Sequence, residues 1–537
     1  MTRHTRRVIA ICAALALAGG VIFYAALAQG IGVTTDPARF IDAARSLAAG
    51  QGLVLRSTGE AEPLTHHPPF YPALLALIAH VGGIEVLAAA RGLHAALLGL
   101  NALGVGLAVQ HLAPRSRWLP PLGVFFTLGS ITLLRLHSLA LSEPLFVLLG
   151  LGGLALLAVY LDSGGRGWLI GAAVAVGLAA LTRYAGAAAV LAGALAIVAW
   201  GRGTLQRRVM IAAGWAGSAL LPLAIWTARN LHTAGSAADR RLALHPVGLD
   251  HLRDGWAAVS GWALPWIRAE DVRGVALVVV VAGLILWGRG HAGGNIGRGP
   301  VLARVLALFG PVYLGFLLVT ISLVDAETPL DERLLAPIYV AGLVIALWIA
   351  GRGRRGLVAL IAAAYAANMI VLAAGFLDHI SREGQGYTGR AWQESALMAQ
   401  IEALPPDTLI YSNGPDAIYF LTGRAAWRIP AERQAGTLEP NPDYAAEVAQ
   451  MGARLAAEGG VMAYFETIDW RWYLPAAAEL TARLPLRAAI TVPDGALYRL
   501  AESEATQSNG AICSKMTAAR LCSQSDALNT ISTGGET

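Results

Sequence analysis

Charged residues are scarce in this sequence, and lysine is nearly absent. Only 14% of the 537 residues are charged and 56% are hydrophobic, with a mean hydropathy of +0.55, whereas soluble domains have about 25% and about 45–50%. This composition excludes an ordinary soluble protein and predicts an integral membrane protein. Of the 40 basic residues, Lys515 is a lysine and 39 are arginines, so a cation inside the membrane body is expected to be arginine or histidine.

Cysteine is also rare, which excludes a disulfide framework. The three cysteines are Cys12, Cys513 and Cys522, and a bridge between the last two is left open. The net charge of +5 indicates little about partners, because in a membrane protein the placement of basic residues matters more than their sum. We expect the lipid bilayer to be a partner and nucleic acid not to be one.

Long apolar runs predict eleven membrane-spanning helices, several of them near the short end of the usual 17–25 residues. The predicted spans are 8–29, 85–112, 118–135, 143–161, 168–182, 185–200, 209–229, 273–290, 301–324, 333–350 and 355–377. The first of these follows a basic segment, as in a signal peptide, but its apolar run is long and lacks a clear cleavage site. We interpret it as a retained first span.

The arginines predict which ends of the spans face the cytoplasm, since arginines close to a span tend to stay on that side. Counting alternately from a cytoplasmic N-terminus, the inner segments hold Arg3, Arg6, Arg7, Arg115, Arg117, Arg166, Arg202, Arg207, Arg208, Arg289, Arg298, Arg352, Arg354 and Arg355. This pattern predicts a multi-pass protein of the inner (plasma) membrane, with the region after Leu377 in the periplasm or its equivalent.

The first outer loop carries far more polar residues than a connector needs. Between residues 30 and 84 it contains Asp36, Asp42, Glu60, Glu62, His66 and His67. Apolar residues recur at helical spacing in 37–49, which predicts an amphipathic helix lying on the bilayer. The run after "HHPP" is too short to span and predicts a second juxtamembrane helix, so that both helices lie within 36–82.

Ionisable residues at the outer ends of the predicted spans converge on one surface. They are Asp36, His66, His67, Arg135, Glu143, Arg183, Arg229, Asp325, Asp331 and Arg333. Charges at a membrane edge are costly, and they usually line a cavity that serves a substrate. A mixture of carboxylates and arginines suits a site that takes a proton from one group and holds an anion on another.

Each of these residues also has a purely structural interpretation. Asp36 can cap the helix that begins at Pro37, and Glu143 can be a first-turn carboxylate favoured by the helix dipole. Arg183 can extend to the interface, and the "DER" of 331–333 can form a surface ion pair. A pair of histidines is weak evidence for a metal.

Several segments, in their order and sidedness, resemble the GT-C superfamily of membrane glycosyltransferases. They are the aspartate after the first span, "HHPPFYPALLAL", "LSEPLF", "LTRYAG" and "DERLLAPIY". The chain is similar to bacterial proteins related to lipid A aminoarabinose transferase and to protein O-mannosyltransferases. The resemblance covers residues 1–377 in layout, so the fold expected is an α-helical polytopic membrane domain with a small α/β extracytoplasmic C-terminal domain.

The resemblance implies a polyprenyl-phosphate sugar donor and a catalytic carboxylate in the first outer loop. By position, it assigns Asp36 and Glu143 as catalytic and His67, Arg183 and Arg333 as donor-phosphate ligands, with His66, Tyr71, Arg229 and Asp331 in the substrate cavity. His67 stands where relatives often carry a lysine, and neutral imidazole is a poorer anion ligand. Pro37 follows Asp36 where protein mannosyltransferases have a second carboxylate, so a divalent metal is left open and no metal ligand is assigned.

The chemistry also follows from the residues themselves. A sugar on a lipid phosphate is already activated, so the enzyme needs a base for the acceptor hydroxyl and positive charge for the departing phosphate. The acceptor is a glycan, a lipid or a protein. A flippase for lipid-linked glycans is the alternative, although its ionisable residues should lie along the spans. A non-catalytic sensor is a third possibility.

The region 378–502 predicts a separate α/β domain. Strands are expected at 407–413 and 461–466, helices at 391–403 and 442–457, and a hairpin at 487–500 with a Pro-Asp-Gly turn. Residues 503–537 are rich in Ser, Thr, Ala and Gly and are expected to be disordered.

Overall fold

The structure, a computed structural model, describes residues 2–240, 242–291, 299–353 and 355–501. The expected disorder of 503–537 and the open Cys513–Cys522 bridge therefore lie outside the described residues. The chain forms two compact units. The first contains residues up to Glu402 with Pro415–Ala426 and Arg433–Pro440, and the second contains Ala403–Gly414, Trp427–Glu432 and the described residues from Asn441 onward.

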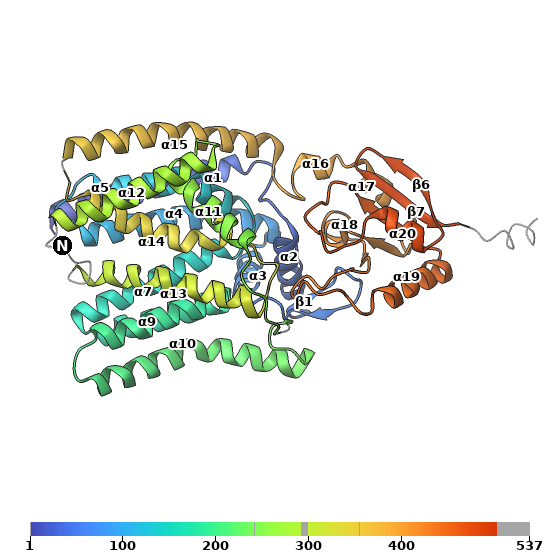
Figure 1. Cartoon of the computed structure of the whole chain (residues 1–537), viewed down its shortest axis with the longest axis horizontal. Coiled ribbons are helices and arrows are strands. Elements are labelled where there is room, and N and C mark those ends of the chain that lie inside the picture. Colours follow the sequence, from blue (N-terminus) through green and yellow to red (C-terminus); the bar gives the residue numbers. More distant parts are fainter. Residues whose placement is uncertain (1, 241, 292–298, 354, 502–537) are drawn as a thin grey trace, which may run out of the picture. The chain divides into compact units, whose positions relative to one another are not determined.

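The first unit is a bundle of long apolar helices that run side by side (Figure 1). Its long helices are α1 (Arg3–Ala26), α4 (Val86–Leu112), α7 (Glu143–Ser163), α8 (Arg166–Thr182), α9 (Gly186–Trp200), α10 (Leu205–Ala234), α12 (Glu270–His291), α13 (Val301–Leu323), α14 (Glu332–Ala350) and α15 (Arg355–Glu383). Shorter helices are α2 (Thr35–Ala48), α3 (Phe70–Gly82), α5 (Leu119–Gly129), α6 (Ile131–Ser138), α11 (Leu249–Ala263), α16 (Arg390–Gln393), α17 (Ala396–Glu402) and α18 (Pro415–Thr422).

Every predicted span coincides with helix, but not all of these helices are long enough to cross a bilayer unaided. Among the described residues, seven helices are long and apolar enough, or eight if the bent pair α5 and α6 counts as one span. The predicted continuous span 118–135 is in fact broken by 54°, at Ser130, whose side chain caps α6 by accepting from the Leu133 N–H. The other predicted spans are α8, α9 and α12, so the count of eleven stays a prediction.

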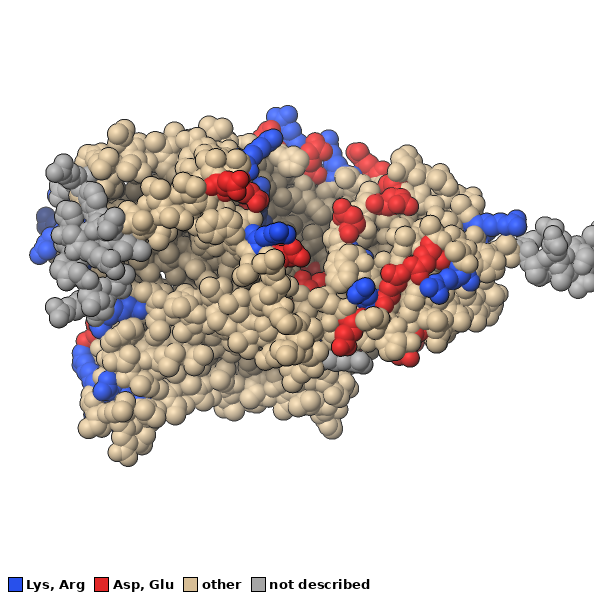
Figure 2. All heavy atoms as spheres, in the orientation of Figure 1, with Lys and Arg blue, Asp and Glu red and all other residues tan. Residues whose placement is uncertain are grey.

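On the face shown in Figure 2, charged side chains gather toward the ends of the helices, and the flank between them is nearly free of charge. At one end of the bundle His111 lies 3.9 Å from Asp162, and the Arg202 guanidinium donates to the Asp162 and Ser163 carbonyls. Arg304 lies over the Trp200 ring at the same end. The ends of α4, α7 and α9 therefore meet the start of α13, as alternating spans require.

At the opposite end, the first outer loop forms the two predicted short helices. Phe40 of α2 packs edge-on against Tyr71 of α3, with ring centroids 5.2 Å apart, and both are buried. Between these helices, β1 (Val54–Leu55) and β2 (Glu62–Pro63) form a short antiparallel ladder. Asp42 accepts from the Arg56 N–H at 2.7 Å. This second carboxylate of the loop therefore stabilises the backbone at Arg56, next to β1.

The second unit is a small α/β domain near the C-terminus, and it begins at Ala403, so that 378–402 belong to the first unit. Its sheet has the order β4-β3-β5-β7-β6, formed by β3 (Ile410–Ser412), β4 (Trp427–Arg428), β5 (Val461–Phe465), β6 (Leu486–Val492) and β7 (Gly495–Leu500). β3 pairs in parallel with β4 and β5, while β6 and β7 form the expected hairpin. Helices α19 (Tyr444–Glu458) and α20 (Ala477–Arg483) complete the unit.

Candidate active site

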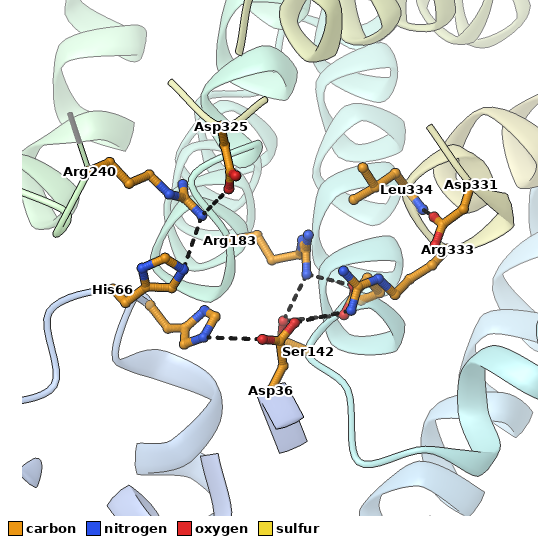
Figure 3. A network of polar contacts seen from close by, with 11 residues as sticks. Asp36, His66, Ser142, Arg183, Arg240, Asp325, Asp331, Arg333 and Leu334 are labelled. Carbon is orange, nitrogen blue, oxygen red and sulfur yellow. Dashed lines mark hydrogen bonds and ion pairs between the residues drawn. The ribbon is translucent and has the colours of Figure 1, made fainter. Parts of the chain in front are cut away.

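Asp36 lies in the first turn of α2, and its side chain leaves that helix for an ion pair. Thr34 occupies the N-cap position of α2, so the interpretation of Asp36 as the cap of that helix is wrong. Its Oδ2 accepts from Arg333 Nη1 at 3.1 Å, and its Oδ1 lies 3.7 Å from His67 Nε2 (Figure 3). The side chain is 32% exposed, so it remains open to a second molecule.

Glu143 is the buried centre of the polar network. It lies in the first turn of α7, and only 2% of its side chain is exposed. Its Oε1 lies 2.7 Å from Arg183 Nη1 and 3.2 Å from Arg333 Nε. A carboxylate this deeply buried is stable only when paired, and here one oxygen is shared by two guanidiniums.

The two arginines reach Glu143 from different turns of the bundle. Arg183 ends α8 in an extended conformation, and the Gly186 N–H donates to its carbonyl at 2.8 Å. A Cβ at Gly186 would lie 2.4 Å from the Ala180 Cα, so the tight α8–α9 turn requires glycine. Arg333 lies in the first turn of α14, which Asp331 caps by accepting from the Leu334 N–H at 2.9 Å.

His66 and His67 join this network to a second ion pair. Arg240 Nη2 lies 3.5 Å from His66 Nε2 and 3.3 Å from Asp325 Oδ2. His67 packs against the Phe40 ring at 4.7 Å. Burial, aided by the charge of Arg240, lowers the pKa of His66 to about 4, and burial holds the pKa of His67 well below its usual range despite the nearby Asp36. Both imidazoles are therefore neutral at pH 7.

The pKa of Asp36 is shifted downward, which is opposite to the usual effect of burial on a carboxyl group. Burial alone would raise its pKa, but the positive charges around it, His67 and Arg333 foremost, hold the pKa well below its usual range. Because His67 is itself neutral at pH 7, we attribute the shift at that pH chiefly to Arg333. Asp36 is consequently a carboxylate at neutral pH. For Asp331, burial prevails over the charge of Arg333 and raises the pKa.

Side chains from α10 and the α8–α9 turn fix the segment that carries the two histidines. Arg229 donates to the Leu64 carbonyl at 3.0 Å, and Asn230 and Tyr184 donate to the Thr65 carbonyl at 3.3 and 3.1 Å. Arg229, expected in the substrate cavity, thus binds the backbone immediately before His66.

Tyr71, also expected in the substrate cavity, lies in the core, where its hydroxyl is 2.8 Å from His94 Nε2. His94 Nδ1 in turn lies 3.0 Å from the His137 carbonyl, and His137 Nε2 lies 3.1 Å from the Asn101 amide nitrogen. The same amide donates to the Pro144 carbonyl at 3.0 Å. This buried chain ends beside Glu143. Its members from the spans were not singled out in the sequence.

Of the outer ring predicted from the sequence, the structure brings together Asp36, His66, His67, Glu143, Arg183, Asp325 and Arg333. Arg135 contacts Glu332 instead, at 3.8 Å. Two members of the network were missed. Ser142 accepts from Arg183 Nη1 at 3.3 Å, and Arg240 lies in the segment between α10 and α11 rather than at a span end. A search for every cation in the loops that were expected to be outer could have found Arg240.

The described residues do not fit a metal centre. Within those parts of the chain no three His, Cys, Asp or Glu side chains are grouped so that they could hold a metal ion. Asp36 and Glu143 are both bound by Arg333, which leaves the two carboxylates facing a guanidinium. We therefore derive no step through a metal.

Comparisons with known proteins identify the fold. No family model matches the chain, and a search of curated proteins finds no match. Among solved structures, ArnT from Cupriavidus metallidurans in the apo state has a TM-score of 0.58 at 14% identity, over 89% of this chain and 95% of its own. The oligosaccharyltransferase AglB from Archaeoglobus fulgidus, in complex with an inhibitory peptide and a dolichol-phosphate, has a TM-score of 0.53 at 11% identity, over 93% and 74%. The chain therefore shares the fold of ArnT and AglB, which is the fold that its motifs led us to expect.

Proposed function

We propose that this protein transfers a sugar from a polyprenyl-phosphate donor to an acceptor hydroxyl at the outer face of the membrane. The observation that supports the proposal most is the network of Asp36, Arg333, Glu143 and Arg183. In it the partly exposed carboxylate of Asp36 pairs with Arg333, and Glu143 joins Arg333 to Arg183. The shared fold supports it too, since AglB, of the same fold, was solved with a dolichol-phosphate.

In this mechanism Asp36 is the general base. Its carboxylate takes the proton of the acceptor hydroxyl as the acceptor oxygen bonds to the anomeric carbon of the sugar. The bond between that carbon and the phosphate oxygen breaks, and the electron pair stays on the phosphate. Polyprenyl phosphate then leaves with its charge balanced by Arg183 and Arg333.

Glu143 is assigned to holding the two arginines. Its side chain is almost fully buried, and one oxygen contacts both guanidiniums. Glu143 therefore orients Arg183 and Arg333, the two residues that would bind the donor phosphate. His67 is assigned to a hydrogen bond with the donor, as a neutral N–H group. Arg240 and His66 lie on the other side of Asp36 and complete the polar surface.

The low pKa of Asp36 links donor binding to base strength. Paired with Arg333 at 3.1 Å, Asp36 is ionised but a weak base. A donor phosphate that engages Arg333 would neutralise part of that guanidinium charge and raise the pKa of Asp36. The base is thus strongest when the donor is in place, which limits unproductive proton transfer.

The test is release of free polyprenyl phosphate from a labelled polyprenyl-phosphate sugar by purified protein. Asp36→Asn keeps the side-chain shape and an acceptor oxygen for Arg333 but removes the base, which should reduce turnover about 10²–10⁴-fold. Arg183→Gln should chiefly weaken donor binding, with a smaller effect on turnover because Arg333 shares the phosphate.

The matched control is Asp42→Asn, the same change on the same helix, where the amide oxygen can still accept from the Arg56 N–H. It should retain wild-type turnover. Turnover of Asp36→Asn within a factor of about three of wild type is too small a loss for a missing base and would refute the assignment. Movement of the labelled lipid across vesicles without release would support the flippase instead.

A further inference from the structure

A cavity of about 430 Å³ lies outside the network of Asp36 and Glu143. Its walls come from α6, from α11, the α11–α12 connection and α12, from the start of α14, and from α15. The lining includes apolar side chains, namely Ile131, Val371, Leu372 and Phe376. It also includes polar side chains, namely Arg135, Arg273, Glu332 and His379.

The two arginines of this cavity are only partly engaged. Arg135 lies 3.8 Å from Glu332, which is too long for a hydrogen bond. Arg273 is 17% exposed and pairs with Glu270 at 3.4 Å, while its buried Nε has no hydrogen-bond partner among the described residues. Gly261 lies beside both charged groups, since a Cβ there would be 3.6 Å from Arg273 Nη1 and 3.8 Å from Glu332 Oε1. Each guanidinium therefore has N–H groups that can donate to an additional anion.

Three of the apolar lining residues, Val371, Leu372 and Phe376, lie on α15. α15 exposes Val371 by 72% and Ile370 by 54%, which in a membrane protein indicates contact with acyl chains. A ligand in this cavity would have an anionic group on the arginines and apolar groups against Leu372 and Phe376. That combination describes an amphiphile with a phosphate at its head.

We propose that this cavity binds the phosphate of a lipid headgroup, through Arg135 and Arg273, with the acyl chains along α15. The site is distinct from the proposed donor site, and it requires neither a sugar nor the transfer reaction. It begins at Glu332, the neighbour of Arg333 on α14, so a lipid held there lies next to the catalytic network. Glu332 opposes the phosphate, since its carboxylate has the same charge and competes for Arg135.

Binding is tested with purified full-length protein in neutral detergent and a phosphatidic acid that carries a fluorophore on one acyl chain. The same fluorophore on phosphatidylcholine and unlabelled inorganic phosphate serve as comparisons. We expect fluorescent phosphatidic acid to bind more tightly than phosphatidylcholine. Inorganic phosphate should compete poorly, because it lacks the chains. Equal affinity for both lipids, or competition by inorganic phosphate as effective as that by unlabelled phosphatidic acid, would overturn the proposal.

Charge variants should act with opposite signs. Arg135→Gln and Arg273→Gln each remove a charge-assisted hydrogen bond and should weaken phosphatidic acid binding about tenfold. Glu332→Gln removes the competing carboxylate and should tighten it. The control is Arg382→Gln on α15, an exposed arginine paired with Asp378, which should leave affinity unchanged. Wild-type affinity in both Arg135→Gln and Arg273→Gln would contradict the assignment.

A glycine pair on α15 gives a steric test that leaves every charge in place. Gly375 lines the cavity, and a Cβ there would meet nothing within 4 Å, so Gly375→Leu should fold normally and occupy the space of the acyl chain. Gly356 lies on the same helix outside the cavity, and its Cβ would also meet nothing within 4 Å. Gly375→Leu should abolish binding that Gly356→Leu retains, and equal binding by the two would refute the site.

Discussion

Glu143 offers the sharpest prediction about how this site is held together. Its carboxylate is 2% exposed and lies 2.7 Å from Arg183 and 3.2 Å from Arg333. Glu143→Gln keeps the volume but removes the charge, so both guanidiniums lose their buried counter-ion. Breaking a buried pair from one side costs about 3–5 kcal/mol.

The lower end of that range is the better expectation here. Arg333 keeps its contact with Asp36, and Arg183 keeps its hydrogen bond to Ser142. Both arginines are also partly exposed, at 30% and 21%, so water takes up part of the uncompensated charge. We therefore expect Glu143→Gln to lower the free energy of unfolding by about 3 kcal/mol.

The assay is denaturant unfolding in mild detergent, followed by intrinsic tryptophan fluorescence. The control is Asp378→Asn, a carboxylate-to-amide change in an exposed pair with Arg382, where the side chains are 57% and 71% exposed. Such pairs contribute at most about 1 kcal/mol. If Glu143→Gln destabilises the protein no more than Asp378→Asn does, Glu143 is not the counter-ion on which the network depends.

A double replacement separates lost charge pairing from lost packing. Glu143→Leu with Arg183→Met removes both charges of the shortest pair and fills a similar volume. Replacement of a buried ion pair by apolar side chains is often neutral, so the double variant should be more stable than Glu143→Leu alone. A coupling energy of about 1 kcal/mol or more between the two changes is expected, and additivity would show that the pair is not coupled.

Three further predictions concern pH, the buried chain and topology. The pKa of His66 is lowered from 6.5 to about 4. Its contribution to stability is therefore complete above pH 6.5 and is lost as pH falls toward 4, because the unfolded state takes up the proton first. When the free energy of unfolding is measured by denaturant between pH 4 and 6.5, His66→Gln should flatten its dependence on pH. Asn101→Leu leaves buried partners unpaired and should cost about 1–3 kcal/mol in the same assay, whereas Asn368→Leu, on an exposed stretch of α15, should cost little. Reporter fusions should place residue 290 inside and residue 390 outside, and an outer position for residue 290 would contradict the shared outer surface.

The sequence predicts the helices well because each span is a local property. An apolar run of about twenty residues has few other ways to satisfy its backbone in a bilayer, and the runs at 85–112 and 301–324 are helical as expected. The bend at Ser130 was not predicted, since it depends on one side chain that caps a new helix within an apolar run. Strands β3 and β5 were predicted for a similar local reason, as short buried runs between helices.

The grouping of the site was predictable, but its pairing was not. Alternation of the spans places Asp36, Glu143, Arg183 and Arg333 on one side, and this needs no three-dimensional information. Which carboxylate faces which arginine depends on the packing of α2, α7, α8 and α14, which are far apart in the sequence. Tyr71 illustrates the limit: its position after "HHPP" suggested a cavity, while its hydroxyl in fact contacts His94 in the core.

The geometry of this site gives a physical reason for arginine rather than lysine at position 333. Arg333 reaches two carboxylates at the same time: its Nη1 donates to Asp36 Oδ2, and its Nε lies 3.2 Å from Glu143 Oε1 in an ion pair. A guanidinium presents both nitrogens in one rigid plane, whereas an ammonium is a single point of charge. Arginine also keeps its charge when buried, because its pKa is far above neutrality. A lysine at position 333 could pair with one carboxylate and would leave the other, in the case of Glu143 a buried one, without its second partner. Two carboxylates held by two arginines thus form a neutral cluster whose remaining N–H donors are available to a phosphate.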